Sequence, residues 1–244
     1  MTPVRVISLD DAHARRASFA KQNQHLDYEI INAVRGTQIA ADVLGNRNLF
    51  APDLKYSKGA LGCALSHLAA WFEAIDTQQP VTVAEDDAIF RHDFHQQQQQ
   101  IIANAPADWD ILVWAWNFDS ILSTNAMPGI SHAVMVFDQN QLRQKTLEFQ
   151  QSTQTPVLLP LDKCFGTPAY TISPKGAARF VEECFPLSNF MLYFPVLNRN
   201  MLNNGIDIAM NRVYSQCQSY VAFPPLAITK NEHEISSIQA ERNL

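Results

Sequence analysis

The sequence predicts an α/β fold built on a doubly wound, mostly parallel sheet. The chain opens with a β-α-β pattern, with strands at residues 4–9 and 28–32 around a helix at 12–24. A short apolar, β-branched run at 81–84 is typical of a strand buried on both faces. The 244 residues, 47% of them apolar, suffice for one such domain.

The N-terminal elements follow from apolar spacing and capping residues. Asp10 and Asp11 form the turn and cap before the first helix. A helix at 59–76 is expected to pack one apolar stripe on the sheet, namely Leu61, Leu65, Leu68, Phe72 and Ile75. A further helix at 93–104 would start at Asp93 and contain the glutamine run 96–100, because Gln is a good helix former.

The C-terminal half is less regular. Strands are expected at 110–116, 132–137, 157–161 and 166–172, with a loop at 117–131 where Asn, Pro and Gly gather. Ser173 and Pro174 begin a helix that runs to 184. Apolar residues crowd 185–197, which predicts packing under an irregular loop; the alternative is a lid or a surface that meets a lipid-linked molecule.

Charge and cysteine usage exclude several classes of protein. The net charge is -6 and the pI is near 5.6, which argues against a nucleic-acid binder. The four cysteines form no C-x-x-C pair, so neither a zinc motif nor a disulfide scaffold is indicated. We see no charged-then-apolar leader and no apolar run near the roughly 20 residues that span a bilayer. These features predict a soluble, cytoplasmic protein.

The strand at 81–84 ends abruptly in Glu85, Asp86 and Asp87. Carboxyl ends of parallel strands open onto ligand clefts in α/β folds. Three adjacent carboxylates repel one another, so a hard divalent cation with oxygen ligands is the natural partner. Glu85 and Asp87 also have the D-x-D spacing by which many sugar transferases hold a metal–nucleotide. The alternative is an acidic turn that ends a strand.

Five blocks in order resemble glycosyltransferase family 25, the lipooligosaccharide galactosyltransferases and their collagen-modifying relatives. The blocks are the first strand, GALGCALSH at 59–67, AEDD at 84–87, GTPAYTIS at 166–173, and Ile206-Asp207 with Pro224-Pro225-Leu226. The resemblance runs from Val4 to about Ile238. Ser8, Ala60 and Ala169 depart from the family pattern, and Ala60 replaces a Glu that is common in the first glycine block.

The resemblance implies a GT-A-like fold and a hexosyltransferase that uses a UDP-sugar, most often UDP-galactose. It implies Mn²⁺ or Mg²⁺ as the cofactor and a lipooligosaccharide or other surface glycan as acceptor. Peripheral contact of the protein with the inner membrane surface stays open. The whole chain, 1–244, would be one domain. Residues up to about 115 would bind the nucleotide sugar, and residues from about 116 would face the acceptor.

Roles are carried over residue by residue. Asp87, with Glu85, is expected to hold the metal, and Glu85 or Asp86 to contact the ribose or ligate through water. Arg15 and Arg16 follow the first strand, and Arg16 is the one assigned to the donor. Glycines near the donor allow close backbone approach. The full set of expected donor contacts is Ser8, Leu9, Arg16, Ala33, Gly36, Gly62, Ser66, His67, Glu85 and Asp86.

An inverting transferase needs a carboxylate base for the acceptor hydroxyl. Asp207, at the start of a short helix, is the family-matched candidate, and Asp162 is the reserve; an ordinary N-cap is the alternative for Asp207. Indole faces stack well on sugar rings, although one of Trp114 and Trp116 is expected in the core. The expected acceptor contacts are Trp116, Asn117, Gly166, Thr167 and Tyr170.

Two rival functions stay open at this point. A nucleotidyltransferase uses a similar sheet and acidic site, but usually carries a Gly-rich basic loop after its first strand, where this chain has Asp10-Asp11-Ala12-His13. A degenerate, non-catalytic sugar-binding protein would keep the fold without the chemistry. The intact acidic run and Asp207 count against it.

Overall fold

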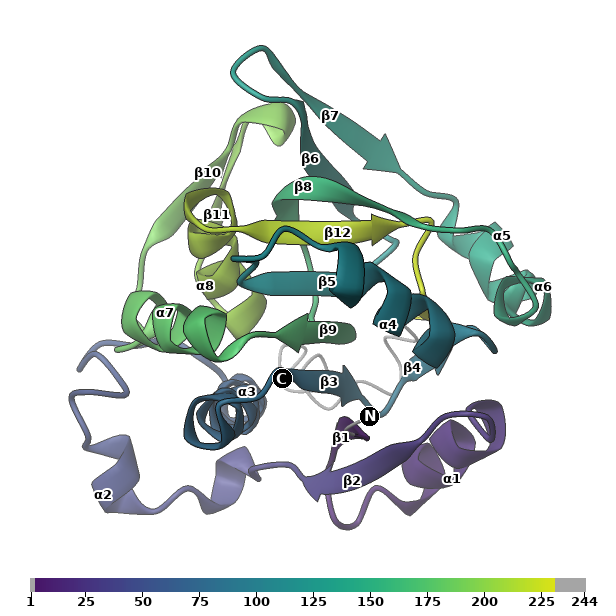
Figure 1. Ribbon diagram of the computed structural model, residues 1–244. Coiled ribbons are helices and arrows are strands. Elements are labelled where there is room, and N and C mark those ends of the chain that lie inside the picture. Colours follow the sequence, from purple (N-terminus) through teal and green to yellow (C-terminus); the bar gives the residue numbers. More distant parts are fainter. Residues whose placement is uncertain (1–2, 231–244) are drawn as a thin grey trace.

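The computed structural model describes residues 3–230 and contains a nine-stranded central sheet with helices on both faces (Figure 1). From one edge to the other the strands are β2 (Tyr28–Asn32), β1 (Val4–Ser8), β3 (Val81–Glu85), β9 (Ala169–Ile172), β5 (Ile111–Ala115), β12 (Ser219–Phe223), β8 (Val157–Cys164), β6 (Ile121–Met127) and β7 (Ser131–Val136). Six of the nine run in one direction, since β9, β8 and β7 pair antiparallel with their neighbours. The expected α/β fold is confirmed, with these three reversals.

Helices cover both faces of this sheet. On one side lie α3 (Lys58–Thr77), α7 (Pro174–Cys184) and α8 (Ile206–Val213), and on the other α1 (His13–Gln22) and α4 (Phe94–Asn104) (Figure 1). Shorter helices are α2 (Ala41–Leu44), α5 (Gln139–Gln144) and α6 (Thr146–Gln150). Two small sheets pair β4 (Ala88–Phe90) with β13 (Ala227–Thr229), and β10 (Met191–Phe194) with β11 (Arg199–Leu202).

Strand β5 shows why both faces are covered. Ile111 and Val113 belong to the hydrophobic core beneath α3 and α7, whereas Leu112 and Trp114 belong to the core beneath α1 and α4. Successive side chains point to opposite faces of a strand, so an unbroken apolar run needs cover on both sides. The β5 run therefore fixes a three-layer arrangement.

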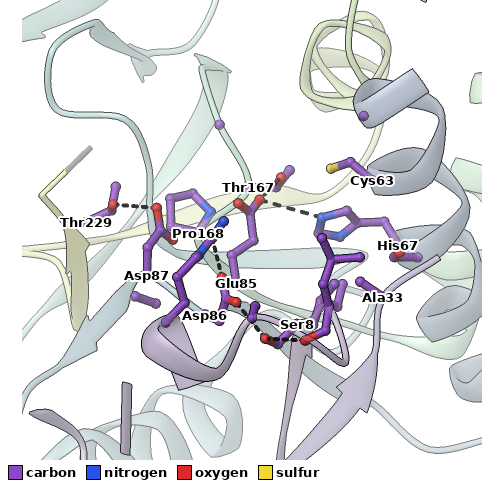
Figure 2. Close-up of a pocket in the computed structure, with 18 of the residues that line it drawn as sticks. Ser8, Ala33, Cys63, His67, Glu85, Asp86, Asp87, Thr167, Pro168 and Thr229 are labelled. Atoms are coloured by element: carbon purple, nitrogen blue, oxygen red, sulfur yellow. Dashed lines mark hydrogen bonds and ion pairs between the residues drawn. The ribbon is translucent and has the colours of Figure 1, made fainter. Parts of the chain in front are cut away.

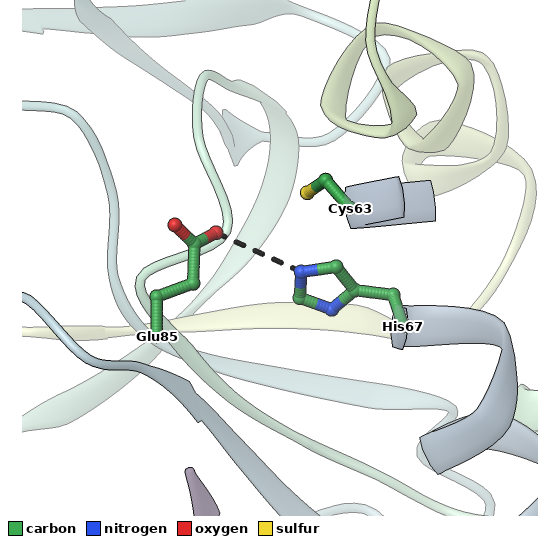
Figure 3. A group of neighbouring side chains, drawn as sticks. All are labelled: Cys63, His67 and Glu85. Atoms are coloured by element: carbon green, nitrogen blue, oxygen red, sulfur yellow. Dashed lines mark ion pairs between the residues drawn. The ribbon is translucent and has the colours of Figure 1, made fainter. Parts of the chain in front are cut away.

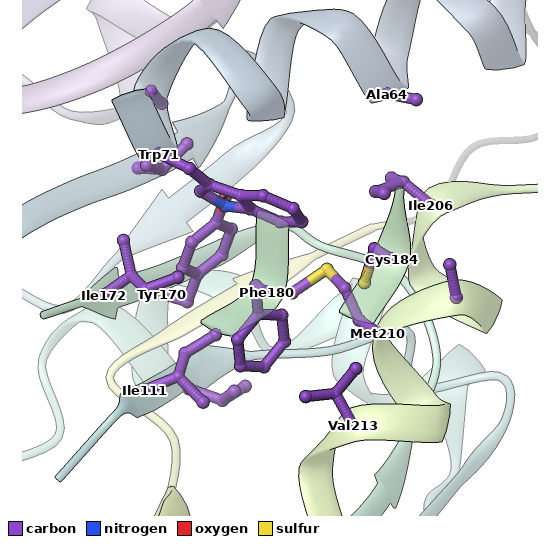
Figure 4. Close-up of a cluster of buried hydrophobic side chains, with 14 of the residues drawn as sticks. Ala64, Trp71, Ile111, Tyr170, Ile172, Phe180, Cys184, Ile206, Met210 and Val213 are labelled. Carbon is purple, nitrogen blue, oxygen red and sulfur yellow. Dashed lines mark hydrogen bonds between the residues drawn. The ribbon is translucent and has the colours of Figure 1, made fainter. Parts of the chain in front are cut away.

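The core beneath α3 and α7 is built around Phe180 (Figure 4). Phe180 is fully buried, and its ring meets Trp71 and Tyr214 with centroids 5.7 Å and 5.9 Å away. We expect Phe180→Ala to lower the free energy of unfolding by about 3–5 kcal/mol through lost burial and a residual cavity. Phe72→Ala is the matched control, because Phe72 is 44% exposed, and should change it by less than about 0.5 kcal/mol. Urea unfolding measures the free energy of unfolding of both variants. Equal losses of stability would contradict the central position of Phe180 in this core.

Several local expectations are wrong. Of the apolar stripe expected on α3, Leu68 is buried and Leu61, Leu65 and Ile75 are partly buried against the same core, whereas Phe72 points to solvent. The fully buried face also carries Ala60, Ala64, His67, Trp71 and Ala74. Small alanines let α3 approach the sheet closely, and a helix that is apolar on most sides gives no clear orientation in the sequence. The first helix begins after Ala12, and no side chain caps it.

The segment expected as a loop, 117–131, contains β6, which pairs with β7 and β8. Its apolar start is followed by the polar run Ser123 to Asn125, so the local pattern is not that of a strand. Its strand conformation comes from pairing with β7, which follows it in a hairpin, and with the more distant β8. The chain between β6 and β7 turns at Gly129, which has a φ of 73°.

Within residues 3–230, no helix has both the length and the apolar composition to cross a membrane. The end of the family resemblance near Ile238 lies outside the described residues.

Candidate active site

A pocket of about 540 Å³ opens where β1 and β3 end (Figure 2). Its walls come from segments far apart in the sequence: the end of β1 with α1, the loop after β2, the start of α3, the acidic end of β3, the loop before β9, the start of α8, and the chain after β13. Strands β1 and β3 are parallel neighbours, so their carboxyl ends meet at one edge of the sheet.

Glu85, the last residue of β3, is held from two sides. The Thr167 hydroxyl donates to its Oε1 at 2.6 Å, and His67 Nε2 lies 3.6 Å from the same oxygen. Burial opposes ionisation of Glu85, but the adjacent His67 outweighs it, with help from Thr167, and holds the pKa of Glu85 below its usual value. Glu85 is therefore a fixed, ionised carboxylate whose oxygens can bind a cation.

Asp86 faces the opposite way and is almost fully buried. The Ser8 hydroxyl donates to its Oδ2 at 2.6 Å, and Arg15 forms an ion pair with its Oδ1. Both oxygens are thus occupied by protein partners. Asp86 connects α1 and β1 to the acidic turn. This arrangement does not support the expected contact of Asp86 with a nucleotide-sugar donor.

Asp87 reaches solvent through the pocket, and its described hydrogen-bond partner is the Thr229 hydroxyl at 3.0 Å. The surrounding protein and the negative charge of Glu85 raise the pKa of Asp87 to about 6. A bound cation would relieve the repulsion that Glu85 exerts on the ionised form of Asp87. Glu85 and Asp87 therefore fit the hard, divalent metal that the sequence implies.

Asp207 lies across the pocket, at the first turn of α8, and touches the loop before β9. The backbone N–H of Gly166 donates to Asp207 Oδ2 at 3.0 Å, and the next residue, Thr167, holds Glu85. One loop therefore connects the candidate base to the candidate metal ligand through adjacent residues. Asp207 caps no helix here, since the N-cap of α8 is Gly205 and no side chain caps it.

Gly166 is required for this connection. Its φ is +75°, and an added Cβ would lie 2.2 Å from Asn117 Oδ1. We expect Gly166→Ala to reduce any activity of this site by about 100-fold or more, because a shift of about 1 Å in catalytic groups has that cost. Gly129→Ala is the control, since Gly129 also has a positive φ but a Cβ there meets open space. Equal activity of the two variants would show that the loop geometry is irrelevant.

Most of the expected donor contacts reach the pocket. Ser8, Leu9, Ala33, Gly36, Ser66, His67 and Glu85 to Asp87 all line it. Two of the expected residues do not. Arg16 donates to Asn32 Oδ1 at 2.8 Å and to Ser8 O at 3.0 Å, and Gly62 packs its Cα against the backbone of the loop after β2.

Arg15 takes the place expected for Arg16, because each residue along a helix is rotated by about 100° and only one of the two faces the pocket. Three further pocket residues, Arg35, Cys63 and Lys230, were not expected. Arg35 forms ion pairs with Asp10 and Asp11 at 2.7 Å and 2.6 Å. Cys63 precedes Ser66 and His67 in a helical spacing, which is a signal that could have found it.

The acceptor-side expectations divide similarly. Asn117, Gly166 and Thr167 line the pocket. Trp116 is fully buried and stacks on Phe118 with centroids 4.5 Å apart, so it is a core residue, as is Trp114. Tyr170 is also buried, and its hydroxyl lies behind the pocket wall, 2.8 Å from His67 Nδ1.

Asp162 does not reach this pocket. It lines a separate pocket of about 180 Å³ with His132 and Tyr214, and Lys163 Nζ donates to its Oδ1 at 3.0 Å. The reserve base therefore lies away from the acidic end of β3.

Comparison with known proteins finds relatives of this sequence. The family model described as glycosyltransferase family 25 (LPS biosynthesis protein) matches residues 1–192. Procollagen galactosyltransferase 2 from Homo sapiens is 32% identical over 101 residues, covering 36% of this chain and 16% of that protein, and the Mus musculus protein matches equally. The chain thus matches only a small part of these curated relatives. Asp207 lies beyond the matched family segment.

Among solved structures, the chain is similar to A197 from STIV, with a TM-score of 0.37 and 8% identity, over 89% of this chain and 79% of that one. The family match covers well over half of the chain, including the glycine block, the acidic end of β3 and the loop before β9. This chain belongs to glycosyltransferase family 25.

Proposed function

We propose that this protein is a metal-dependent, inverting glycosyltransferase that moves a hexose, namely galactose, from a UDP-sugar to a surface glycan. One observation supports this most strongly: adjacent residues of one loop hold Asp207 and Glu85, the candidate base and a candidate metal ligand. Family membership supports glycosyl transfer, and the procollagen galactosyltransferases that match part of the chain support galactose.

The donor would bind at the acidic end of β3. Glu85 and Asp87 would hold a divalent cation, Mn²⁺ or Mg²⁺, which when bound neutralises charge on the departing diphosphate. Arg15, Arg35 and Lys230 line the same pocket. The charge of Arg15 is balanced by Asp86, and that of Arg35 by Asp10 and Asp11. Asp86 is held by Ser8 and Arg15, and so keeps the turn that presents Glu85 and Asp87 in place.

Asp207 would accept the proton of the attacking acceptor hydroxyl. The hydrogen bond from the Gly166 N–H orients the Asp207 carboxylate at the pocket wall, where an acceptor hydroxyl would approach it. A positioned general base contributes about 100- to 10,000-fold to rate. Inversion requires this base on the sugar face opposite the leaving diphosphate, which is the reason for assigning separate roles to Asp207 and to the end of β3.

Product formation tests the proposal. The protein, with Mn²⁺, is incubated with UDP-galactose, UDP-glucose or their N-acetyl forms and a panel of truncated lipooligosaccharides, and released UDP and the modified glycan are measured. We expect transfer with UDP-galactose and an inverted anomeric linkage in the product. Retention of configuration would exclude the assigned role of Asp207, and binding of glycans without product or metal dependence would favour the non-catalytic alternative.

A lipid-linked acceptor would bring the protein to the cytoplasmic face of the inner membrane. The β10–β11 hairpin supports this contact, because Met191 and Tyr193 are 58% and 49% exposed, although Phe185, Leu187 and Phe194 of the same region are buried. Expected membrane binding is tested by flotation with anionic liposomes, where Met191→Glu/Tyr193→Glu should lose binding. The matched control is Met127→Glu/Ile130→Glu, at the exposed β6–β7 hairpin; equal flotation of both double variants would contradict the contact.

A further inference from the structure

Cys63, His67 and Glu85 converge on one space at the inner wall of the pocket (Figure 3). Their donor atoms, a thiol sulfur, a ring nitrogen and a carboxylate oxygen, all lie within 4.8 Å of one another. Cys63 and His67 are four residues apart on α3, so they share one face of the helix. Glu85 reaches the same space from the end of β3.

The imidazole of His67 has one satisfied and one unsatisfied nitrogen. Its Nδ1 lies 2.8 Å from the Tyr170 hydroxyl, which in turn accepts from Trp71 Nε1 at 2.9 Å. Its Nε2 is buried and makes no hydrogen bond among the described residues, although it is directed at Glu85 Oε1, 3.6 Å away. A buried nitrogen without a partner is costly, so it points to a missing ligand.

The three donors match a borderline-soft cation. Zn²⁺ takes cysteine sulfur, histidine nitrogen and carboxylate oxygen in a tetrahedral arrangement, whereas Mn²⁺ and Mg²⁺ prefer oxygen. Nitrogen and oxygen ligands of a tetrahedral zinc ion are separated by about 3.4 Å, close to the observed 3.6 Å between Nε2 and Oε1. A ligating histidine usually uses its other nitrogen in a hydrogen bond, as His67 does with Tyr170.

We propose that Cys63, His67 and Glu85 form a second cation site that binds Zn²⁺ or a similar ion, with its fourth position open to the pocket. Binding would release the Cys63 thiol proton to solvent and leave the sulfur as a thiolate ligand. This site differs from the proposed Mn²⁺ site, which pairs Glu85 with Asp87. The proposal does not require the protein to transfer a sugar.

Cobalt spectroscopy tests it. Metal-free full-length protein, without a polyhistidine tag, is titrated with Co²⁺, which takes the place of Zn²⁺ and absorbs in the near ultraviolet when a thiolate binds it. We expect one equivalent of Co²⁺ to produce this band and Zn²⁺ to remove it. Cys63→Ser and Cys63→Ala should abolish the band and weaken Zn²⁺ binding by at least about 100-fold. Cys217→Ser is the matched control, because Cys217 is also half-buried but does not line the pocket.

Absence of the band in the wild-type protein would overturn the proposal, and so would a band that persists in folded Cys63 variants. Either result would leave His67 and Glu85 as a simple ion pair. Asp87→Asn separates this proposal from the transferase proposal: it should lose Mn²⁺-dependent UDP binding and keep the cobalt band. A cobalt band in a protein that never binds UDP would support the cation site and count against the donor site.

Discussion

Asp87→Asn is expected to abolish glycosyl transfer by removing one of two carboxylates that hold the donor's cation. Asparagine keeps the size of the side chain and can still accept the hydrogen bond from Thr229, so the fold should be unaffected. It loses the negative charge on which a hard cation depends. Affinity for UDP in the presence of Mn²⁺ should fall by at least about 100-fold, measured by calorimetry together with the transfer rate.

Asp76→Asn makes the same chemical change outside the site, because Asp76 is exposed near the end of α3 and does not line the pocket. It should bind UDP and turn over like the wild type. If Asp87→Asn binds UDP and Mn²⁺ as tightly as Asp76→Asn, Asp87 is not a metal ligand.

Asp207→Asn should have the opposite signature, with lost turnover and intact donor binding. The amide oxygen can still accept from the Gly166 N–H, so the loop should stay in place. An amide does not accept a proton at neutral pH, and we expect the transfer rate to fall by about 100- to 10,000-fold. UDP and Mn²⁺ should bind as in the wild type, which calorimetry checks on the same samples.

Asp162→Asn distinguishes the two carboxylates that were candidates for the base. Asp162 lines a different pocket, so this change should leave turnover largely intact, provided that thermal unfolding shows a folded protein despite the loss of its ion pair with Lys163. Near-normal turnover of Asp207→Asn together with inactive, folded Asp162→Asn would reverse the assignment.

The sequence predicted the elements whose pattern is set by burial. The strand at 81–84 and the helix at 59–76 appear within one residue of their expected ends, as β3 and α3. Both are apolar segments with clear boundaries in the sequence. Strand β6 was not predicted, because its conformation depends on pairing with residues up to 42 positions away, such as Leu122 with Cys164.

Site residues were predictable where a motif marks the end of a strand. Glu85, Asp87 and Gly166 are motif residues, and all three line the pocket. Trp116 and Tyr170 were misplaced because a sequence does not show which side of a strand faces ligand and which faces core; both side chains are buried. Arg15 and Arg16 are neighbours on α1, so only one of them can face the pocket. Which one does so depends on how α1 is rotated against β1.

The three carboxylates of the acidic run illustrate the same limit. Their adjacency predicts mutual repulsion and a bound cation. It does not predict which carboxylate pairs with a protein group and which ones face the pocket. In the structure Asp86 is neutralised by Arg15, whose position comes from tertiary packing, while Glu85 and Asp87 remain turned to the pocket. The spacing Glu85-x-Asp87 in the sequence had already identified the two carboxylates that remain turned to the pocket.

The most direct test of the central claim is calorimetric titration of UDP into the protein, first with Mn²⁺ and then with EDTA. The account predicts saturable binding with Mn²⁺ that EDTA removes, since Glu85 and Asp87 would hold the diphosphate only through a cation. Absence of binding in both conditions, or equal binding with and without metal, would contradict a metal-dependent nucleotide-sugar site at the end of β3.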